Sequence, residues 1–188
     1  IALPGYCYIR ADFHPDPPKE AFEHTLLINP KMAFGTGHHA TTRMVLLELK
    51  DHPLTGKKVL DYGCGTGILG IVAAQRGAAE VTAIDIDPAS TENSRENAEA
   101  NHCSLQLHTG DLKVLPPGKT YDLILANINR NVILNALPTL YKLLEKDGIL
   151  IISGFLEEVL ERMQETLAPQ GFAQLHHRQE GDWICLTL

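Results

Sequence analysis

Along the chain, short runs of apolar residues alternate with longer stretches in which apolar residues recur at the spacing of a helix. Five apolar runs predict strands, at residues 59–62, 81–85, 105–108, 121–126 and 148–153. Three stretches predict helices, at residues 68–76, 88–101 and 132–144. Because strand and helix follow each other in turn, the pattern predicts an α/β fold with a mostly parallel, doubly wound sheet and helices on both faces.

The C-terminal residues depart from this alternation. One more helix is predicted from an apolar face at helical spacing, made of Leu156, Val159, Leu160, Met163 and Leu167. Residues 172–176 and 183–188 then predict two strands that flank a polar turn at residues 180–182. The sequence therefore predicts an antiparallel hairpin at the C-terminal end.

The N-terminal residues are less regular. Residues 1–23 are rich in proline, which disfavours a central strand or a helix interior, and we interpret them as a strand-bearing lead-in or linker segment. Residues 24–28 predict a short strand. The glycine-rich loop at residues 32–42 precedes a helix that Thr41 or Thr42 is expected to cap.

A glycine-rich loop follows the first central strand and leads into a helix, which is how an α/β protein presents a helix N-terminus to a ligand. Gly65, Gly67 and Gly70 satisfy the dinucleotide fingerprint, with Asp85 at the distance of a ribose-binding carboxylate. On this match, a nicotinamide-dependent oxidoreductase remains an alternative function. Asp61, however, places a carboxylate beside the loop, which repels a pyrophosphate and attracts the ammonium of S-adenosylmethionine.

Four motifs in sequence order resemble those of class I S-adenosylmethionine-dependent methyltransferases. They are the loop at residues 61–67, Asp85, the pair Gly110 and Asp111, and Asn127. The resemblance implies a Rossmann-like fold and S-adenosylmethionine as the cofactor.

Within that superfamily the chain resembles the ribosomal protein L11 methyltransferase family over about residues 26–183. The resemblance is carried by four segments, at residues 33–42, 84–88, 126–128 and 153–154. His38 and Ala40 depart from it, because the family usually has threonine and proline there. The implied activity is methyl transfer to amino groups of ribosomal protein L11, at lysine ε-amino and also α-amino groups. Another protein or a small molecule stays open as the acceptor.

The family also carries an N-terminal substrate-recognition domain. We expect residues 24–188 to be the methyltransferase domain, with that recognition domain absent from this chain.

Several residues have expected roles in cofactor binding. Gly63, Gly65 and Gly67 let the backbone approach the cofactor without a Cβ, and the following helix N-terminus is expected to receive the methionyl carboxylate. Asp61 is expected to hold the ammonium directly or through water. Asp85 is suited to accept hydrogen bonds from both ribose hydroxyls.

The remaining site residues come from other segments. Asp111 is expected either to accept from the adenine amino group or simply to form a turn. Thr42 and Phe34 are expected to line the cofactor site from the N-terminal side. Asn127 is the expected catalytic residue, because its carbonyl oxygen is suited to orient the attacking amine. No general base is assigned.

Charge and composition narrow the partners further. The formal net charge of −7 disfavours nonspecific nucleic acid binding and suits a basic protein partner. The cysteines form no Cys-x-x-Cys pair, which favours a reduced, cytoplasmic setting. His38 and His39 lack companions at ligand spacing, so we expect no metal and a place for them along a pocket. No apolar run is long enough to cross a membrane. As the oligomeric state, we favour a monomer.

Overall fold

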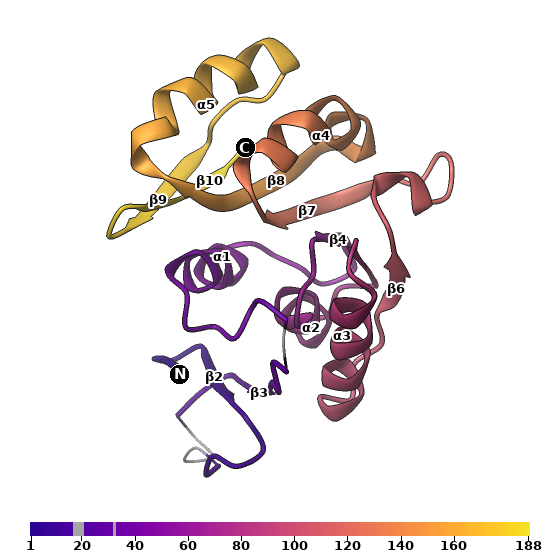
Figure 1. The fold of residues 1–188 in the computed structure, drawn as a ribbon, viewed down its shortest axis with the longest axis vertical. Helices are drawn as coiled ribbons and strands as arrows, with labels where there is room; N and C mark the ends of the chain where they lie inside the picture. The colour runs from indigo at the N-terminus through magenta and orange to yellow at the C-terminus, as the bar shows by residue number, and fades with distance from the viewer. Residues whose placement is uncertain (17–20, 32) are drawn as a thin grey trace.

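A seven-stranded sheet forms the centre of the computed structural model, which describes residues 1–16, 21–31 and 33–188. The strand order is β6-β5-β4-β7-β8-β10-β9 (Figure 1). The strands are β4 (Lys58–Tyr62), β5 (Glu80–Asp85), β6 (Gln106–Thr109), β7 (Tyr121–Asn127), β8 (Leu144–Leu156), β9 (His176–Glu180) and β10 (Trp183–Thr187). Neighbouring pairs from β6 to β8 are parallel, and β10 is antiparallel to both β8 and β9. The predicted fold class is confirmed.

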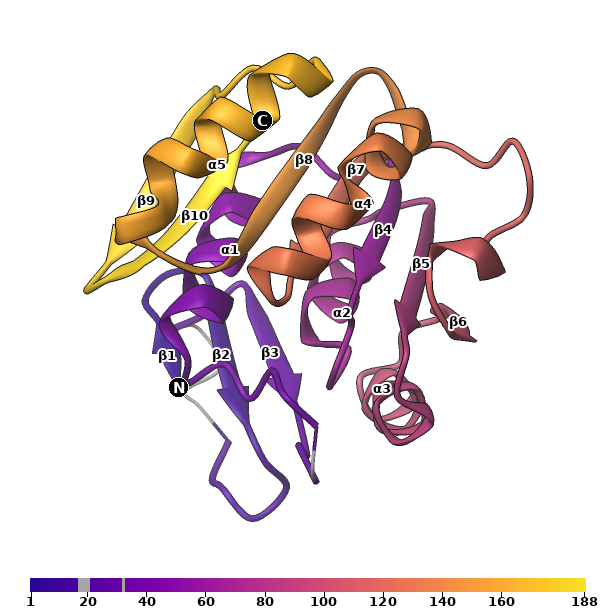
Figure 2. The same cartoon turned by 45° about the horizontal axis from the view of Figure 1, so that its top comes forward.

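Helices cover both faces of this sheet (Figures 1 and 2). They are α1 (Ala40–Asp51), α2 (Ile68–Gln75), α3 (Pro88–Ala100), α4 (Arg130–Leu143) and α5 (Leu160–Leu167). Consecutive residues of one strand pack into two separate hydrophobic cores. Val59 packs with α1 and α2, and the next residue, Leu60, packs with α4 and α5. The central strands are apolar on both faces, as expected for a covered parallel sheet.

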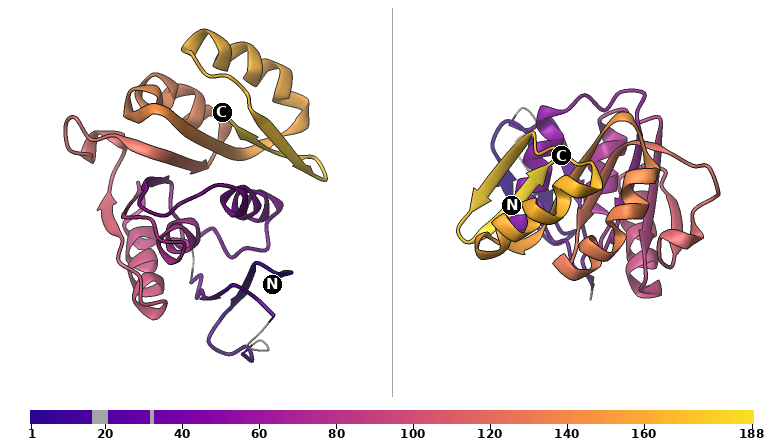
Figure 3. Two further views of the ribbon diagram at one scale, coloured as in Figure 1. Left: turned by 180° about the vertical axis from the view of Figure 1, so that it is seen from behind. Right: turned by 90° about the horizontal axis from the view of Figure 1, so that it is seen from above.

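A small second sheet lies beside α1 and α2 (Figure 3). It contains β1 (Ala2–Leu3), β2 (Cys7–Arg10) and β3 (His24–Leu27), with β1 antiparallel and β3 parallel to β2. The strand predicted at residues 24–28 therefore belongs to this small sheet. Tyr6 and Leu26 are both fully buried in the core shared with α1 and α2. Pro17, Pro18 and Met32, which the sequence analysis assigned to the lead-in and to a loop, lie outside the described residues.

A ladder of asparagines on α3 fastens the small sheet to the rest of the fold. Asn101 accepts from the Leu27 amide at 2.9 Å and donates to the Leu27 carbonyl at 2.7 Å. One turn earlier, Asn97 accepts from the Asn29 amide and donates to the Thr66 carbonyl in the glycine-rich loop. These bonds satisfy backbone groups that have no strand partner on that side.

The C-terminal hairpin is present, but its first strand was placed too early. We predicted that strand at residues 172–176, whereas β9 begins at His176. Phe172 is instead a buried residue of the core under α4 and α5. Because β9 is a polar, largely exposed edge strand with the sequence His-His-Arg-Gln-Glu, it carries no apolar alternation from which to predict it.

Two other boundaries differ from the predictions. The strand predicted at residues 148–153 extends over all of β8, so that Leu156 ends a strand instead of starting a helix. The following residues form a short 3-10 turn before α5 begins. Of the predicted apolar face, Met163 and Leu167 are buried.

The first helix is capped by a residue other than the two proposed. Thr41 and Thr42 lie inside α1, and His39 is the N-cap, with its side chain accepting from the Thr41 amide. The predicted cap of α3 is confirmed, because Asp87 accepts from the Ala89 amide ahead of Pro88. Within the part of the chain that the structure describes, no helix has both the length and the apolar character that a membrane span requires.

Candidate functional site

A cavity of about 590 Å³ opens at the carboxyl ends of the central strands. It lies where the sheet order reverses, since β5 and β6 extend from β4 to one side and β7 and β8 to the other. Its lining comprises Phe34, His39, Thr41, Tyr62, Gly63, Gly65, Asp85, Ile86, Ser90, Gly110, Asp111, Asn127, Ile128, Asn129, Val132, Gly154 and Trp183. Two carboxylates and no lysine or arginine stand among these described residues, so the cavity favours a neutral or cationic ligand.

The strand order divides the cavity into two halves. Asp85 ends β5 and Asp111 follows β6, both on one side of β4. Asn127 ends β7 on the other side, and Trp183 begins β10 beyond it. An elongated ligand across the end of β4 therefore has carboxylates at one end and an amide and aromatic rings at the other.

The glycine-rich loop after β4, at residues 63–67, has no free amide for an anion. The N–H groups of Gly63 and Cys64 donate to the Ile84 carbonyl, and that of Gly65 donates to Asp85 Oδ2 at 3.0 Å. The next two amides, those of residues 66 and 67, donate to backbone carbonyls of Phe34 and Cys64. A methionyl carboxylate therefore finds no donor among the amides of residues 63–67, and its predicted receipt by the helix N-terminus, which begins at Ile68, stays a prediction. The same bonds leave a pyrophosphate without the amide cradle that a dinucleotide site needs.

Gly65 brings this loop against the segment that carries Phe34. Its φ is +54°, and a Cβ on Gly65 would lie 2.3 Å from the Phe34 carbonyl oxygen. That oxygen accepts from the Thr66 amide, so it cannot retreat without loss of a hydrogen bond. A side chain at position 65 therefore separates the two loops that wall the cavity.

We expect Gly65→Ala to lower the melting temperature and to abolish ligand binding, because it adds a backbone clash to about 1–3 kcal/mol of strain from its positive φ. Gly118→Ala is the matched control. It has a φ of +76° but nothing within 4 Å of the added Cβ. Thermal melts and calorimetry compare the two variants, and equal effects would show that the approach to Phe34 is unimportant.

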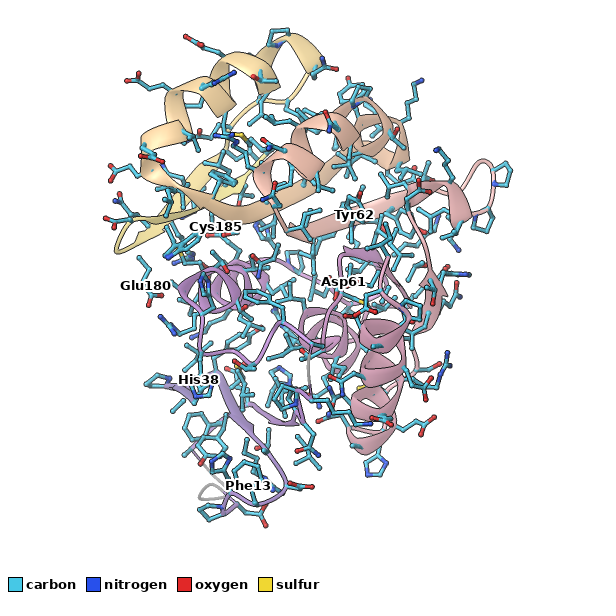
Figure 4. All side chains as sticks on the ribbon, in the orientation of Figure 1. Phe13, His38, Asp61, Tyr62, Glu180 and Cys185 are labelled. Carbon is cyan, nitrogen blue, oxygen red and sulfur yellow. The ribbon has the colours of Figure 1, made fainter. Side chains whose placement is uncertain are left out.

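Asp61 lies on β4 beside the loop (Figure 4). It is 1% exposed and does not line the cavity. Its Oδ2 accepts from the Gly70 amide at 3.0 Å, while Oδ1 is buried without a partner in the part of the chain that the structure describes. Burial is the main cause that raises the pKa of this carboxyl to about 7. The Gly70 hydrogen bond lowers the pKa, and the charge of Asp85 raises it further. An adjacent cation would satisfy Oδ1 and stabilise the carboxylate.

The other two predicted carboxylates line the cavity and also hold the backbone. Asp85 Oδ2 accepts from Gly65 and Oδ1 accepts from the Asp87 amide at 3.0 Å. Asp111 accepts from the Lys113 amide at 2.9 Å, which is the turn-forming role that the sequence analysis offered as one alternative. Each carboxylate keeps lone pairs for a ligand, since an ionised carboxylate accepts about four hydrogen bonds.

Asn127 and Thr42 form a pair at the end of β7. Asn127 Nδ2 donates to Thr42 Oγ1 at 3.2 Å, and Thr42 is fully buried behind the cavity wall. Because this bond fixes the amide, its carbonyl oxygen is left for another donor, and Oδ1 is buried with no partner among the residues that the structure describes. Thr42 thus orients Asn127 and does not itself line the cavity.

Three rings from distant parts of the sequence form an aromatic wall, defined here as Phe34, His39 and Trp183. The ring centroids of His39 lie 5.4 Å from Phe34 and 4.6 Å from Trp183, both edge to face. The expectation that a histidine lies along the pocket holds for His39. His38 lies along a separate, smaller cavity beside β2. Sequence reasoning missed Trp183, because no local signal relates a hairpin strand to a loop so far earlier in the chain.

The structure therefore places the predicted residues in two groups. Five of them line the cavity together with Asn127, namely Phe34, Gly63, Gly65, Asp85 and Asp111. Thr42, Asp61 and Gly67 lie behind this lining. Ile86, Ile128 and Val132 add apolar lining that the sequence analysis did not assign. Such apolar residues beside a strand end look like ordinary core or helix residues in the sequence.

Comparison with known families identifies the group of proteins to which this site belongs. A family model described as ribosomal protein L11 methyltransferase (PrmA) matches residues 7–188. The chain belongs to the ribosomal protein L11 methyltransferase family. The match includes both cavity loops and the hairpin that carries Trp183, so the resemblance inferred from the motifs is confirmed.

Curated relatives in this family are similar over nearly the whole chain. A ribosomal protein L11 methyltransferase of Phocaeicola vulgatus is 42% identical over 187 residues, which cover 99% of this chain and 66% of the relative. One from Bacteroides fragilis is 41% identical with the same coverage. The chain thus spans about two thirds of the length of these relatives.

Solved structures agree with this family and with the fold. A crystal structure of ribosomal protein L11 methylase from Lactobacillus delbrueckii subsp. bulgaricus has a TM-score of 0.89 and 30% identity, covering 97% of this chain and 93% of that one. The T. thermophilus 16S rRNA N2 G1207 methyltransferase in complex with AdoMet and guanosine has a TM-score of 0.69 at 22% identity. It covers 82% of this chain and 44% of that one, and this likeness concerns the fold alone.

Proposed function

We propose that this protein transfers methyl groups from S-adenosylmethionine to amino groups of ribosomal protein L11, at lysine side chains and also at α-amino groups. One observation carries the choice of cofactor. Asp61 is fully buried beside the glycine-rich loop, with an oxygen that has no partner among the described residues, and the described cavity lining contains no lysine or arginine. This arrangement suits a ligand with an ammonium and a sulfonium, and it opposes one with phosphates.

The two halves of the cavity suggest how the cofactor lies. Asp85 would accept from the ribose hydroxyls, and Asp111 from the adenine amino group. Because Asp61 lies behind the cavity lining, it would hold the ammonium of the methionyl end through water, which places the sulfonium at the end of β4. The methyl group would then face Asn127 and the aromatic wall, where the acceptor enters.

In this arrangement the protein contributes to the reaction mainly by positioning the acceptor nitrogen and the methyl group. S-adenosylmethionine supplies an electrophilic methyl group, and the acceptor nitrogen must approach it in line with the bond to sulfur. The free carbonyl oxygen of Asn127 would accept from the acceptor N–H and hold the lone pair toward the methyl group. A lysine must first lose a proton, and a dry cavity beside a sulfonium lowers its pKa from about 10.4 toward neutrality.

The acceptor is proposed from the family and from charge. A net charge of −7 suits a basic partner such as a ribosomal protein. We propose the cytoplasm as the place of the reaction, and residues 24–188 as the methyltransferase domain. We also propose that recognition of L11 depends on a separate N-terminal domain, as the family resemblance implies. A different protein or small molecule stays the alternative acceptor.

Calorimetry distinguishes methyl transfer from nicotinamide chemistry. We expect S-adenosylhomocysteine to bind the protein and NADH to show no heat of binding, because the amides of residues 63–67 are occupied and the described cavity lining contains no lysine or arginine. Tight binding of NADH with no binding of S-adenosylhomocysteine would instead support the oxidoreductase alternative and contradict the proposed function.

A further inference from the structure

Arg43 on α1 joins the two segments that carry the aromatic wall. Its Nε donates to both carboxylate oxygens of Glu180, at 3.0 and 3.2 Å, and Nη2 donates to the same carboxylate. Its Nη1 donates to the carbonyl of His38, directly before His39. Figure 4 shows Glu180 beside α1, with His38 below it.

Glu180 in turn lies directly across from Trp183. The two residues are paired in the antiparallel register of β9 and β10. The contacts therefore form a closed ring, which runs from Trp183 to Glu180, through Arg43 to the His38 carbonyl, and back through His39 to Trp183. A closed ring fixes the relative position of the loop and the hairpin.

From this ring we infer that Arg43 and Glu180 are positioning residues that hold the aromatic wall in place for the acceptor. The inference rests on the proposed function, because the wall occupies the half of the cavity assigned to the acceptor amine. Arg43 is 27% and Glu180 41% exposed, so the pair adds little to stability. The pair acts instead by fixing positions, since the guanidinium fork of Arg43 holds the Glu180 carboxylate and the His38 carbonyl in one plane.

A second ion pair between the same two elements provides a matched control. Arg178 on β9 pairs with Asp51 at the end of α1. Asp51 is 58% exposed, and neither residue lines the cavity. Asp51→Asn therefore removes an ion pair between α1 and β9 without touching the aromatic wall.

The test measures steady-state methyl transfer to purified ribosomal protein L11 by Arg43→Gln, Arg43→Lys, Glu180→Gln and Asp51→Asn. Because a misplacement of about 1 Å costs on the order of 100-fold in rate, we expect kcat/KM for L11 to fall by about 10- to 100-fold in the first three variants. Affinity for S-adenosylhomocysteine should stay near the wild-type value in all four. Arg43→Lys should fail because an ammonium lacks the planar fork.

A spectroscopic readout tests the ring separately from the activity. Trp183 is the single tryptophan of the chain, so acrylamide quenching of its fluorescence reports the wall alone. Quenching should rise in the Arg43 and Glu180 variants and not in Asp51→Asn. Equal quenching and equal kcat/KM in Arg43→Gln and Asp51→Asn would overturn the inference. Absence of transfer by the wild-type protein at its full natural length, the form used for the kinetics, would instead refute the proposed function and leave the quenching comparison to decide the role of Arg43.

Discussion

Asn127→Ala should reduce methyl transfer by about 100-fold or more while it weakens cofactor binding far less. The variant removes the free carbonyl oxygen that is proposed to orient the acceptor nitrogen, and loss of such a positioned group costs about 10²–10³ in rate. Among the described residues the side chain is hydrogen-bonded to Thr42 alone, so the fold should tolerate the change. Single-turnover rates and calorimetry with S-adenosylhomocysteine measure the two effects.

Thr42→Val provides a graded control for this prediction. It removes the hydroxyl that holds Asn127 at 3.2 Å and leaves the carbonyl oxygen in place. We expect a smaller loss of rate than in Asn127→Ala, again with little change in cofactor affinity. If both variants kept the wild-type rate, Asn127 would have no part in the reaction.

Asp61→Asn should lower the affinity for S-adenosylhomocysteine by about 10- to 100-fold at pH 7.5, which is the worth of a charge-assisted hydrogen bond to the ammonium. Asparagine keeps an oxygen for the Gly70 amide, so the fold is retained. Asp111→Asn is the comparison, because it removes a carboxylate from the opposite end of the cavity.

The same variant should change how stability depends on pH. The pKa of Asp61 is raised to about 7 in the folded protein, while an unfolded aspartate has a pKa of about 3.9. The folded state therefore binds the proton more tightly, and the stabilisation from the protonated carboxyl is lost as pH rises from about 4 through about 7. Relative to the wild type, Asp61→Asn should gain stability across that interval, as measured by urea unfolding at several pH values.

Cofactor binding should show the opposite trend. A ligand ammonium favours the ionised carboxylate, so the affinity of the wild type for S-adenosylhomocysteine should rise between pH 6 and about 7.5 as Asp61 ionises. Asp61→Asn should lose this rise and Asp111→Asn should keep it. An Asp61→Asn variant that binds as tightly as the wild type at every pH would exclude a contact between Asp61 and the ammonium.

The central part of the fold was predictable because its sequence signals are local. Strands β4, β5 and β7 are buried on both faces, so they stand out as continuous apolar runs, and the carboxylates and the amide at their ends mark the cavity. Asp87 and Pro88 likewise announce α3. Strand β9 gave no such signal, because an exposed edge strand needs no apolar side chains.

The parts of the site that could not be predicted depend on tertiary contacts. Whether the amides of residues 63–67 are free depends on their pairing with Ile84, Asp85 and Phe34, which the loop sequence does not reveal. His39 became a helix cap and part of the aromatic wall because Trp183 and Arg43 fix its surroundings. Such contacts join residues far apart in the sequence and have no periodic pattern.

The central claim is methyl transfer to ribosomal protein L11, and mass spectrometry tests it most directly. L11 is incubated with S-adenosylmethionine and either the wild-type protein at its full natural length or its Asn127→Ala variant. We expect methyl mass additions on L11, located by peptide mapping on amino groups, with the wild type and far fewer with the variant. Unmodified L11 after incubation with a wild-type protein that binds S-adenosylhomocysteine would contradict it.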